Sequence, residues 1–182
     1  MCMEFADIIK DRISIRSYSD TPVEGEKITY VLDCARRAPS WDNMQCWRFI
    51  VITNKETIAA LTKTSMSNPW LKTAPVVIIA CADPTDSGTH HSIEYYTVDV
   101  AIAVEHLILA ATDVRLGTCW IGVFNEEKIK KMLEIPKRIR IVALIPLGYP
   151  ADKKGLVSST FRFITRGERR KSLDELVHHE KW

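Results

Sequence analysis

The strongest constraint on the fold is an uninterrupted run of apolar residues from Val76 to Ala82. A strand with one face in water alternates apolar and polar side chains, whereas a strand covered on both faces reads as a continuous apolar run. Pro75 stands before the run, and the stretch from Asp83 to His91, rich in Asp, Ser, Thr and Gly, follows it as a loop. We therefore expect a strand at 76–82 with other elements of the chain packed on both of its faces.

Helical and extended patterns surround this strand. Apolar residues at helical spacing predict helices at about 4–11 and after Glu24. Two more helices are expected, one capped by Asn54 or Thr53 and the other by Asn125. Apolar and β-branched runs predict three further strands, at 47–53, 116–124 and 139–147.

The longest apolar segment, Thr97 to Ala111, predicts a helix that is buried on most of its sides. Asp99, Glu105 and His106 interrupt it, and buried polar groups need hydrogen-bond partners. We interpret His106 as a hydrogen-bonded helix histidine or an interface residue rather than as a catalytic base. A chain of 182 residues has little room to enclose a whole helix, so we expect a second copy to cover part of it.

Near the N-terminus, alternation predicts an extended segment with Arg12, Ser14 and Arg16 on one side and Ile13 and Ile15 on the other. Two guanidinium groups that flank a hydroxyl can bind a phosphate, because the planar fork of arginine pairs with an oxyanion bidentately. The other interpretation is a solvent-facing edge above a buried isoleucine pair. The residues alone leave both interpretations open.

A turn without glycine, residues 36–48, connects the second predicted helix to the first strand. Pro39 cannot continue a helix, and Ser40, Asp42, Asn43 and Gln45 supply donors and acceptors at nearly alternate positions. Side chains of these types bond readily to their own backbone. Residue types alone therefore favour a self-capped loop.

The densest basic stretch runs from Arg166 to Lys171, and a capping-box helix start follows at Ser172. A lone basic run is usually a solvated tail. Beside Arg12 and Arg16, it becomes a candidate third side of a phosphate pocket.

Composition excludes several classes of function. The net charge of +2 is too small to indicate a nucleic-acid or membrane partner. Five cysteines without C-x-x-C spacing argue against a disulfide framework or a cysteine-ligated metal. The pair His90-His91 is not interpreted as a metal site, because adjacent side chains on a strand point apart. With no signal-peptide pattern at the N-terminus, we expect a cytoplasmic protein.

The usual catalytic constellations do not occur in the sequence. It contains no G-x-G-x-x-G or Walker A loop and no nucleophile-elbow context for a serine. An enzyme whose chemistry resides in a cofactor needs none of these patterns.

Four segments stand in a distinctive order. They are Arg-x-Ser-x-Arg-x-Tyr from Arg12, Pro-Ser-x-x-Asn-x-Gln-x-Trp-Arg-Phe from Pro39, Leu-Gly-Thr-x-Trp-Ile-Gly from Leu116, and the basic run before the last predicted helix. Together they resemble the nitroreductase family of FMN-dependent NAD(P)H oxidoreductases. The sequence departs from the family's usual residues at four positions, with Cys46 for proline, His106 for asparagine, Arg115 for glycine and Glu168 for lysine.

The resemblance implies that residues 1–182 form one FMN-binding domain of the α+β class. The expected fold is a three-layer α/β/α arrangement around a mixed, mostly antiparallel sheet, built as an intertwined homodimer. The residues expected to bind FMN are Arg12, Ser14, Arg16, Pro39, Ser40, Trp41, Asn43, Gln45, Trp120, Ile121, Gly122, Arg169 and Arg170. Of these, Pro39, Ser40 and Trp41 would come from the partner chain. The flavin would carry the chemistry, so neither a catalytic side chain nor a metal ligand is expected.

The implied activity is ping-pong hydride transfer from NAD(P)H through FMN to a small electron-poor acceptor, such as a nitroaromatic or a quinone. Two alternatives remain open. One is a flavin-binding or storage protein without significant turnover, and the other is a related FMN enzyme of different chemistry, such as a dehalogenase.

Overall fold

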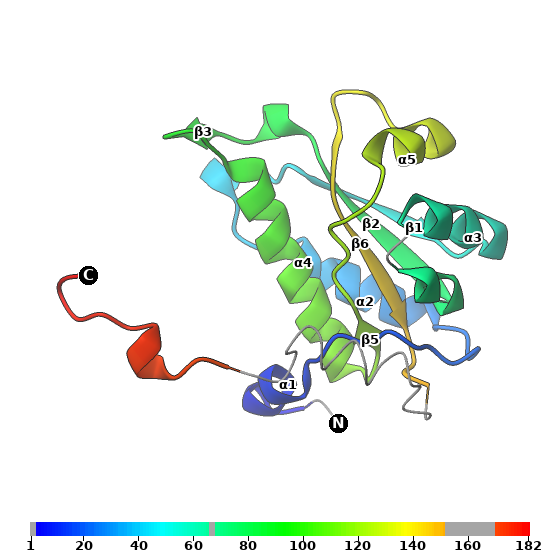
Figure 1. Ribbon diagram of the computed structural model, residues 1–182, viewed down its shortest axis with the longest axis horizontal. Coiled ribbons are helices and arrows are strands. Elements are labelled where there is room, and N and C mark those ends of the chain that lie inside the picture. Colours follow the sequence, from blue (N-terminus) through cyan, green and yellow to red (C-terminus); the bar gives the residue numbers. More distant parts are fainter. Residues whose placement is uncertain (1–2, 66–67, 152–169) are drawn as a thin grey trace.

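A four-stranded antiparallel sheet forms the centre of the computed structural model, which describes residues 3–65, 68–151 and 170–182 (Figure 1). In spatial order its strands are β1 (Trp47–Ile52), β2 (Val76–Ala82), β6 (Arg140–Gly148) and β5 (Gly117–Thr118). Every neighbouring pair of these strands is antiparallel. A parallel bridge between Ser14 and Thr118 adds the N-terminal segment at the β5 edge, which makes the arrangement mixed, as predicted.

The apolar run at 76–82 is the inner strand β2, and all seven of its residues are buried. Its even-numbered residues, such as Ile78, belong to one hydrophobic cluster, and its odd-numbered residues, such as Ile79, belong to a second one. Because successive side chains of a strand point to opposite faces, each face of the sheet has its own core. The prediction of a strand covered on both faces is confirmed.

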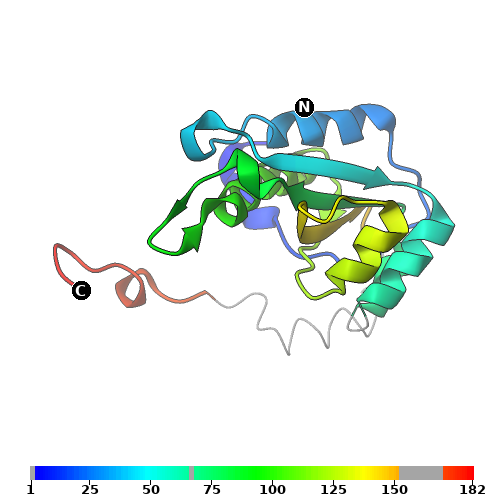
Figure 2. The ribbon, with the colours of Figure 1, turned by 90° about the horizontal axis from the view of Figure 1, so that it is seen from above.

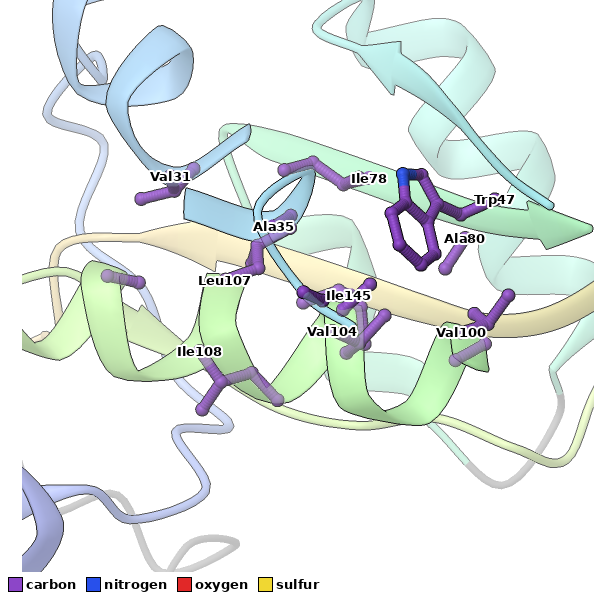
Figure 3. Close-up of a cluster of buried hydrophobic side chains, with 14 of the residues drawn as sticks. Val31, Ala35, Trp47, Ile78, Ala80, Val100, Val104, Leu107, Ile108 and Ile145 are labelled. Carbon is purple, nitrogen blue, oxygen red and sulfur yellow. The ribbon is translucent and has the colours of Figure 1, made fainter. Parts of the chain in front are cut away.

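Helices cover both faces of the sheet (Figures 1 and 2). Helices α2 (Gly25–Ala35) and α4 (Tyr95–Asp113) pack on one face, and α3 (Lys55–Thr64) and α5 (Glu126–Leu133) pack on the other. Figure 3 shows Val31 and Ala35 of α2 and Leu107 of α4 gathered over Ile78 and Ile145 of the sheet. The smaller elements are α1 (Phe5–Asp11), η1 (Trp41–Asn43), η2 (Pro69–Thr73), η3 (Pro84–Asp86), β3 (Thr89–His90), β4 (Ile93–Glu94) and η4 (Leu173–Glu175).

Two helix starts follow the sequence closely. The Asn54 side chain accepts a hydrogen bond from the backbone N–H of Thr57 at 2.9 Å, and Asn125 accepts one from Lys128 at 2.9 Å. Each bond satisfies a backbone donor that has no partner within the first turn of its helix. The cap predicted at Asn125 is confirmed, and of the two candidates Asn54 and Thr53 the structure selects Asn54.

The strand predicted at 116–124 is much shorter in the structure. Only Gly117 and Thr118 pair as a strand, and Ile121 makes one further bridge to Leu144 in the same register. Within that register Pro146 of β6 lies between the paired positions, and a proline has no N–H to donate to a neighbouring strand. The ladder is therefore interrupted, and the chain around Trp120 is irregular.

The helix expected after Ser172 is also shorter than predicted. The capping box forms: the Ser172 side chain accepts from the backbone N–H of Glu175, and the Glu175 carboxylate accepts from the backbone N–H of Ser172 at 3.2 Å. Only the single turn η4 follows, and residues 170–182 are exposed throughout. Without a surface on which to bury an apolar face, so short a segment has little to stabilise a longer helix.

The predicted long helix is α4, which contributes more buried residues to the first hydrophobic cluster than any other element that the structure describes. By length and composition it could cross a membrane, but half of its apolar window is buried inside the fold, where it packs on the sheet as a core helix. His106 is half-buried and its Nδ1 lies 3.4 Å from the carbonyl oxygen of Cys34, which agrees with the interpretation of a hydrogen-bonded helix histidine. Four residues remain exposed along one side of α4: Thr97, Val98, Ala101 and Glu105.

Arg115 shows why the family usually has glycine at this point. It follows the end of α4 with φ 64, in the left-handed region where a side chain is disfavoured. The N–H of Leu116 donates to Ala111 and that of Arg115 to Thr112, so the helix closes with the bonding pattern that normally ends in glycine.

Glu126 at the start of α5 ties this helix to the sheet. Its carboxylate accepts hydrogen bonds from the backbone N–H of Ile141 at 3.0 Å and from Arg140 Nε at 3.1 Å. The Nζ of Lys130, whose side chain is only 8% exposed, lies 3.0 Å from the same carboxylate. Burial raises the pKa of Glu126, but these three partners outweigh burial and hold the pKa below its ordinary value.

Replacing Glu126 by glutamine is expected to lower the free energy of unfolding by about 2 kcal/mol at pH 7, because buried Lys130 loses its counter-charge. A carboxyl with a lowered folded-state pKa stabilises the fold above its unfolded pKa of about 4.3 and ceases to do so as the pH falls. Stability of the variant should therefore decline less steeply than that of the wild type below pH ~5. Denaturant unfolding at several pH values measures both effects. Glu127→Gln is the control, since Glu127 is largely exposed and 3.9 Å from the same Nζ; equal losses in both variants would contradict the argument.

Candidate functional site

The N-terminal segment joins the sheet at β5. Ser14 forms the parallel bridge to Thr118, and the backbone N–H of Ile15 donates to the Thr118 carbonyl at 2.8 Å. A Cβ on Gly117 would lie 2.5 Å from Cγ1 of Ile15, which is closer than packed atoms approach. Glycine at this position therefore lets the 12–18 segment lie flat against β5.

This junction brings Arg12, Ser14 and Arg16 around one buried residue, Cys119. Burial raises the pKa of the Cys119 thiol, while the charges of Arg16 and Arg12 and a hydrogen-bond contact with Ser14 act in the opposite direction. Arg12, Ser14 and Arg16 are each half-buried. Three of the predicted site residues thus gather beside the 117–122 segment and form a positively charged cradle. We name these three residues the N-terminal cradle.

The other predicted residues of the 117–122 segment face outward in part. Ile121 is buried, while the Trp120 side chain is 40% exposed. A Cβ on Gly122 would meet only the Trp120 indole, at the ordinary contact distance of 3.5 Å. Within the described part of the chain nothing else crowds Gly122, so this surface has room for a flat group.

The 40–46 loop combines local hydrogen bonds with an unusual backbone. Ser40 Oγ accepts from the Gln45 backbone N–H at 2.9 Å, and Gln45 Nε2 donates to the Asn43 carbonyl at 3.0 Å, so the expected self-capping is confirmed. Asp42, Asn43 and Gln45 all have positive φ, between 44 and 58. Such conformations cost energy in residues with side chains and are concentrated at functional sites. Asn43 and Gln45 are nevertheless exposed, and Trp41 is half-buried.

The structure does not bring this loop to the N-terminal cradle within one chain. The backbone N–H of Trp41 donates to Asp99, near the start of α4, whereas Gly117 follows the end of α4 at Asp113. Asp99 and Asp113 are fourteen residues apart on α4, or about 21 Å along the helix axis. Figure 1 shows the same separation, with the loop beside the β3 end of α4 and β5 at its other end. The two groups of predicted site residues therefore lie at opposite ends of one helix.

The basic side of the predicted pocket stays a prediction. Arg169 lies outside the described residues. Arg170 begins the exposed tail of residues 170–182, which runs away from the body of the molecule in Figures 1 and 2. The tail presents large apolar side chains to solvent, among them Leu173, Leu176 and Trp182.

The histidine pair differs in geometry from the prediction. His90 and His91 lie at an exposed hairpin with ring centroids 4.0 Å apart, because His91 has left-handed φ 46 rather than strand geometry. Among residues 3–65, 68–151 and 170–182, no group of three or more His, Cys, Asp or Glu side chains is placed to hold a metal ion.

Sequence reasoning did not assign a role to Asp99. It is 2% exposed and receives donors from Trp41, Cys46 and Ser87. The signal in the sequence was a carboxylate near the start of a mostly apolar helix, but the partners of Asp99 are distant in the sequence.

Known proteins resemble this chain along nearly all of its length. The model of the nitroreductase family matches residues 9–68 and 59–149. A protein of Archaeoglobus fulgidus, to which NADH dehydrogenase or NAD(P)H nitroreductase activity is ascribed, is 32% identical over 98% of this chain and 99% of its own. The FMN reductase [NAD(P)H] of Bacillus subtilis is 29% identical over 80% of this chain and 65% of its own.

A solved structure supports the same assignment. The crystal structure of a nitroreductase family protein from Clostridium difficile superposes with a TM-score of 0.84, at 32% identity, over 99% of this chain and 100% of that one. The layered fold, the four motifs in order and these similarities agree with one another, and we conclude that the chain belongs to the nitroreductase family.

Proposed function

We propose that this protein is an FMN-dependent oxidoreductase that passes hydride from NAD(P)H to a small electron-poor acceptor by a ping-pong mechanism. The observation that carries the proposal is the N-terminal cradle beside the open 120–122 surface. A charged cradle next to an uncrowded, partly apolar surface is what a phosphate joined to a flat ring requires.

The residues present fit FMN. Arg12, Ser14 and Arg16 supply two guanidinium groups and a hydroxyl for the phosphate, the ribityl chain and the pyrimidine edge of the ring. Trp120, Ile121 and Gly122 would lie along the ring, where Gly122 leaves room for close approach. Bound FMN would supply the hydride-accepting chemistry of the site. One arginine would anchor the phosphate, and the other would stabilise negative charge that develops at the pyrimidine edge on reduction.

A second copy of the chain would complete each site. The 40–46 loop and the N-terminal cradle lie at opposite ends of α4, so Pro39, Ser40 and Trp41 can meet a flavin on the cradle only from another subunit. Asn43 and Gln45 belong to the same loop.

Exposed apolar side chains support a homodimer. Helix α1 has no buried residue, and Phe5 and Ile9 are 69% and 50% exposed. The side of α4 that carries Val98 and Ala101 and the tail of residues 170–182 are exposed as well. Apolar side chains exposed on several elements indicate an interaction surface. In a symmetric dimer, each copy would cover this surface of the other copy.

The purified protein is expected to be yellow, with the two absorbance bands of an oxidised flavin. Addition of NADH or NADPH under anaerobic conditions should bleach the longer-wavelength band, and a subsequent nitroaromatic or quinone should restore it. This cycle distinguishes turnover from storage, because a storage protein would keep its colour when the nicotinamide is added. A colourless preparation that stays colourless in excess FMN would overturn the proposal.

A further inference from the structure

Asp99 is a buried carboxylate in the second turn of α4, a helix that is otherwise mostly apolar. Burial of an ionised carboxylate is costly unless hydrogen bonds replace its lost hydration. Its bonds therefore show which parts of the fold depend on it.

Three donors from two other segments converge on this carboxylate. The Trp41 backbone N–H lies 3.0 Å from Oδ1, Ser87 Oγ lies 2.8 Å from Oδ2, and Cys46 Sγ lies 3.6 Å from Oδ2. Burial, and after it the charge of Asp99, raises the pKa of Cys46 to about 12, so the thiol keeps its proton and can donate it.

Trp41 and Cys46 stand at the two ends of the strained stretch with positive φ at Asp42, Asn43 and Gln45. Strained conformations persist only where the surrounding structure holds them. Asp99 bonds both ends of the stretch, and so fixes the distance that the strained residues must span.

The third donor extends this arrangement to the hairpin after β2. Ser87 precedes Gly88, where a Cβ would lie 2.2 Å from the indole of Trp41. The Trp41 ring also packs on Tyr95, with ring centroids 4.5 Å apart. The Asp99 carboxylate and the Trp41 indole thus both connect the 40–46 loop to the 87–95 hairpin.

We propose that Asp99 is a positioning residue for the flavin site: it holds the 40–46 loop in the conformation that reaches the FMN of a second subunit, and it couples that loop to the 87–95 hairpin. This inference rests on the proposed function. Asp99 acts through the loop and does not itself contact the flavin.

The test compares Asp99→Ala with Asp99→Asn and with the matched control Asp113→Ala. Asp113 is a half-buried carboxylate at the other end of α4 and accepts from the Met3 backbone N–H at 2.8 Å and from Tyr30 at 3.0 Å. Asp113→Ala removes a comparable set of hydrogen bonds from the same helix, at the end of α4 that lies away from the 40–46 loop. The double variant Cys46→Ala/Ser87→Ala leaves Asp99 with the Trp41 bond alone and carries the same test if Asp99→Ala does not fold.

Two measurements are made on the full-length chain. Amide hydrogen exchange on the flavin-free protein reports the loop directly, and titration with FMN followed by flavin fluorescence reports its effect on the site. In Asp99→Ala we expect exchange at 41–46 to be about tenfold faster and FMN affinity about tenfold weaker. Asp99→Asn, which still accepts from the Trp41 N–H, should fall between Asp99→Ala and wild type. Asp113→Ala should resemble wild type in the exchange at 41–46, because Asp113 lies at the other end of α4.

The outcomes separate this inference from the function on which it rests. If wild type binds FMN and Asp99→Ala binds it equally well, or if Asp113→Ala speeds exchange at 41–46 to the same degree, the inference is wrong and the proposed function stands. If wild type binds no FMN, the proposed function fails and the inference fails with it.

Discussion

Replacing Arg16 by alanine is expected to weaken FMN binding by about 100-fold, because a half-buried guanidinium that pairs with an anionic group contributes strongly to affinity. The variant should purify with little flavin and lose reductase rate in proportion. Arg16 lies beside Cys119 and Tyr18 at the junction of the N-terminal segment with β5, where its charge acts on both groups. Flavin content from the absorbance spectrum and the FMN dissociation constant from titration measure the effect.

Controls separate the role of the guanidinium from its charge and from the fold. Lys63→Ala removes one positive charge from an exposed position on α3, on the opposite side of the sheet from α4, and should leave FMN binding unchanged. Arg16→Lys keeps the charge but loses the planar fork, so it should recover only part of the affinity. Thermal unfolding of the flavin-free forms shows whether Arg16→Ala still folds. Wild-type flavin content together with wild-type turnover in a folded Arg16→Ala protein would refute the assignment.

Features of the fold that depend on neighbouring residues in the sequence were predictable. The run at 76–82 shows its two-sided burial in its own composition, and the caps at Asn54 and Asn125 act within one helical turn. The 116–124 strand was predicted too long for the opposite reason. Its length depends on Pro146 in the neighbouring strand, and the paired strand cannot be identified from the 116–124 pattern.

The candidate site likewise combines features that depend on neighbouring residues, which were predictable, with features that depend on distant residues, which were not. The alternation of Arg12, Ser14 and Arg16 is local, and the structure adds that Gly117 lets this segment lie against β5. The self-capped loop was also predictable from its residue types. Its positive φ angles were not, because Asp, Asn and Gln adopt the left-handed region in a minority of cases, and the bonds from Asp99 to both ends of this stretch come from a distant part of the sequence.

The separation between the N-terminal cradle and the 40–46 loop leads to the second large expected effect. Consider Arg16→Ala, which damages the N-terminal cradle, and Ser40→Glu, which places bulk and negative charge on the loop that would face the flavin. Each variant alone should damage both sites of a homodimer. In a heterodimer of the two, one site would receive both intact halves and the other both damaged halves. We expect an isolated heterodimer to bind about half the FMN of the wild-type dimer and to show about half its turnover.

Two different affinity tags on co-expressed chains allow the heterodimer to be purified away from both homodimers. The flavin absorbance per dimer and the NAD(P)H oxidation rate then give the number of working sites. If each site lay within one chain, both sites of the heterodimer would carry one damaged half, and the heterodimer would be inactive. Recovery would therefore mean that the loop and the cradle of one site come from different chains, which is the arrangement we propose from the about 21 Å between Asp99 and Asp113 along α4. A heterodimer as inactive as its two parents would place both halves in one chain and contradict the shared site.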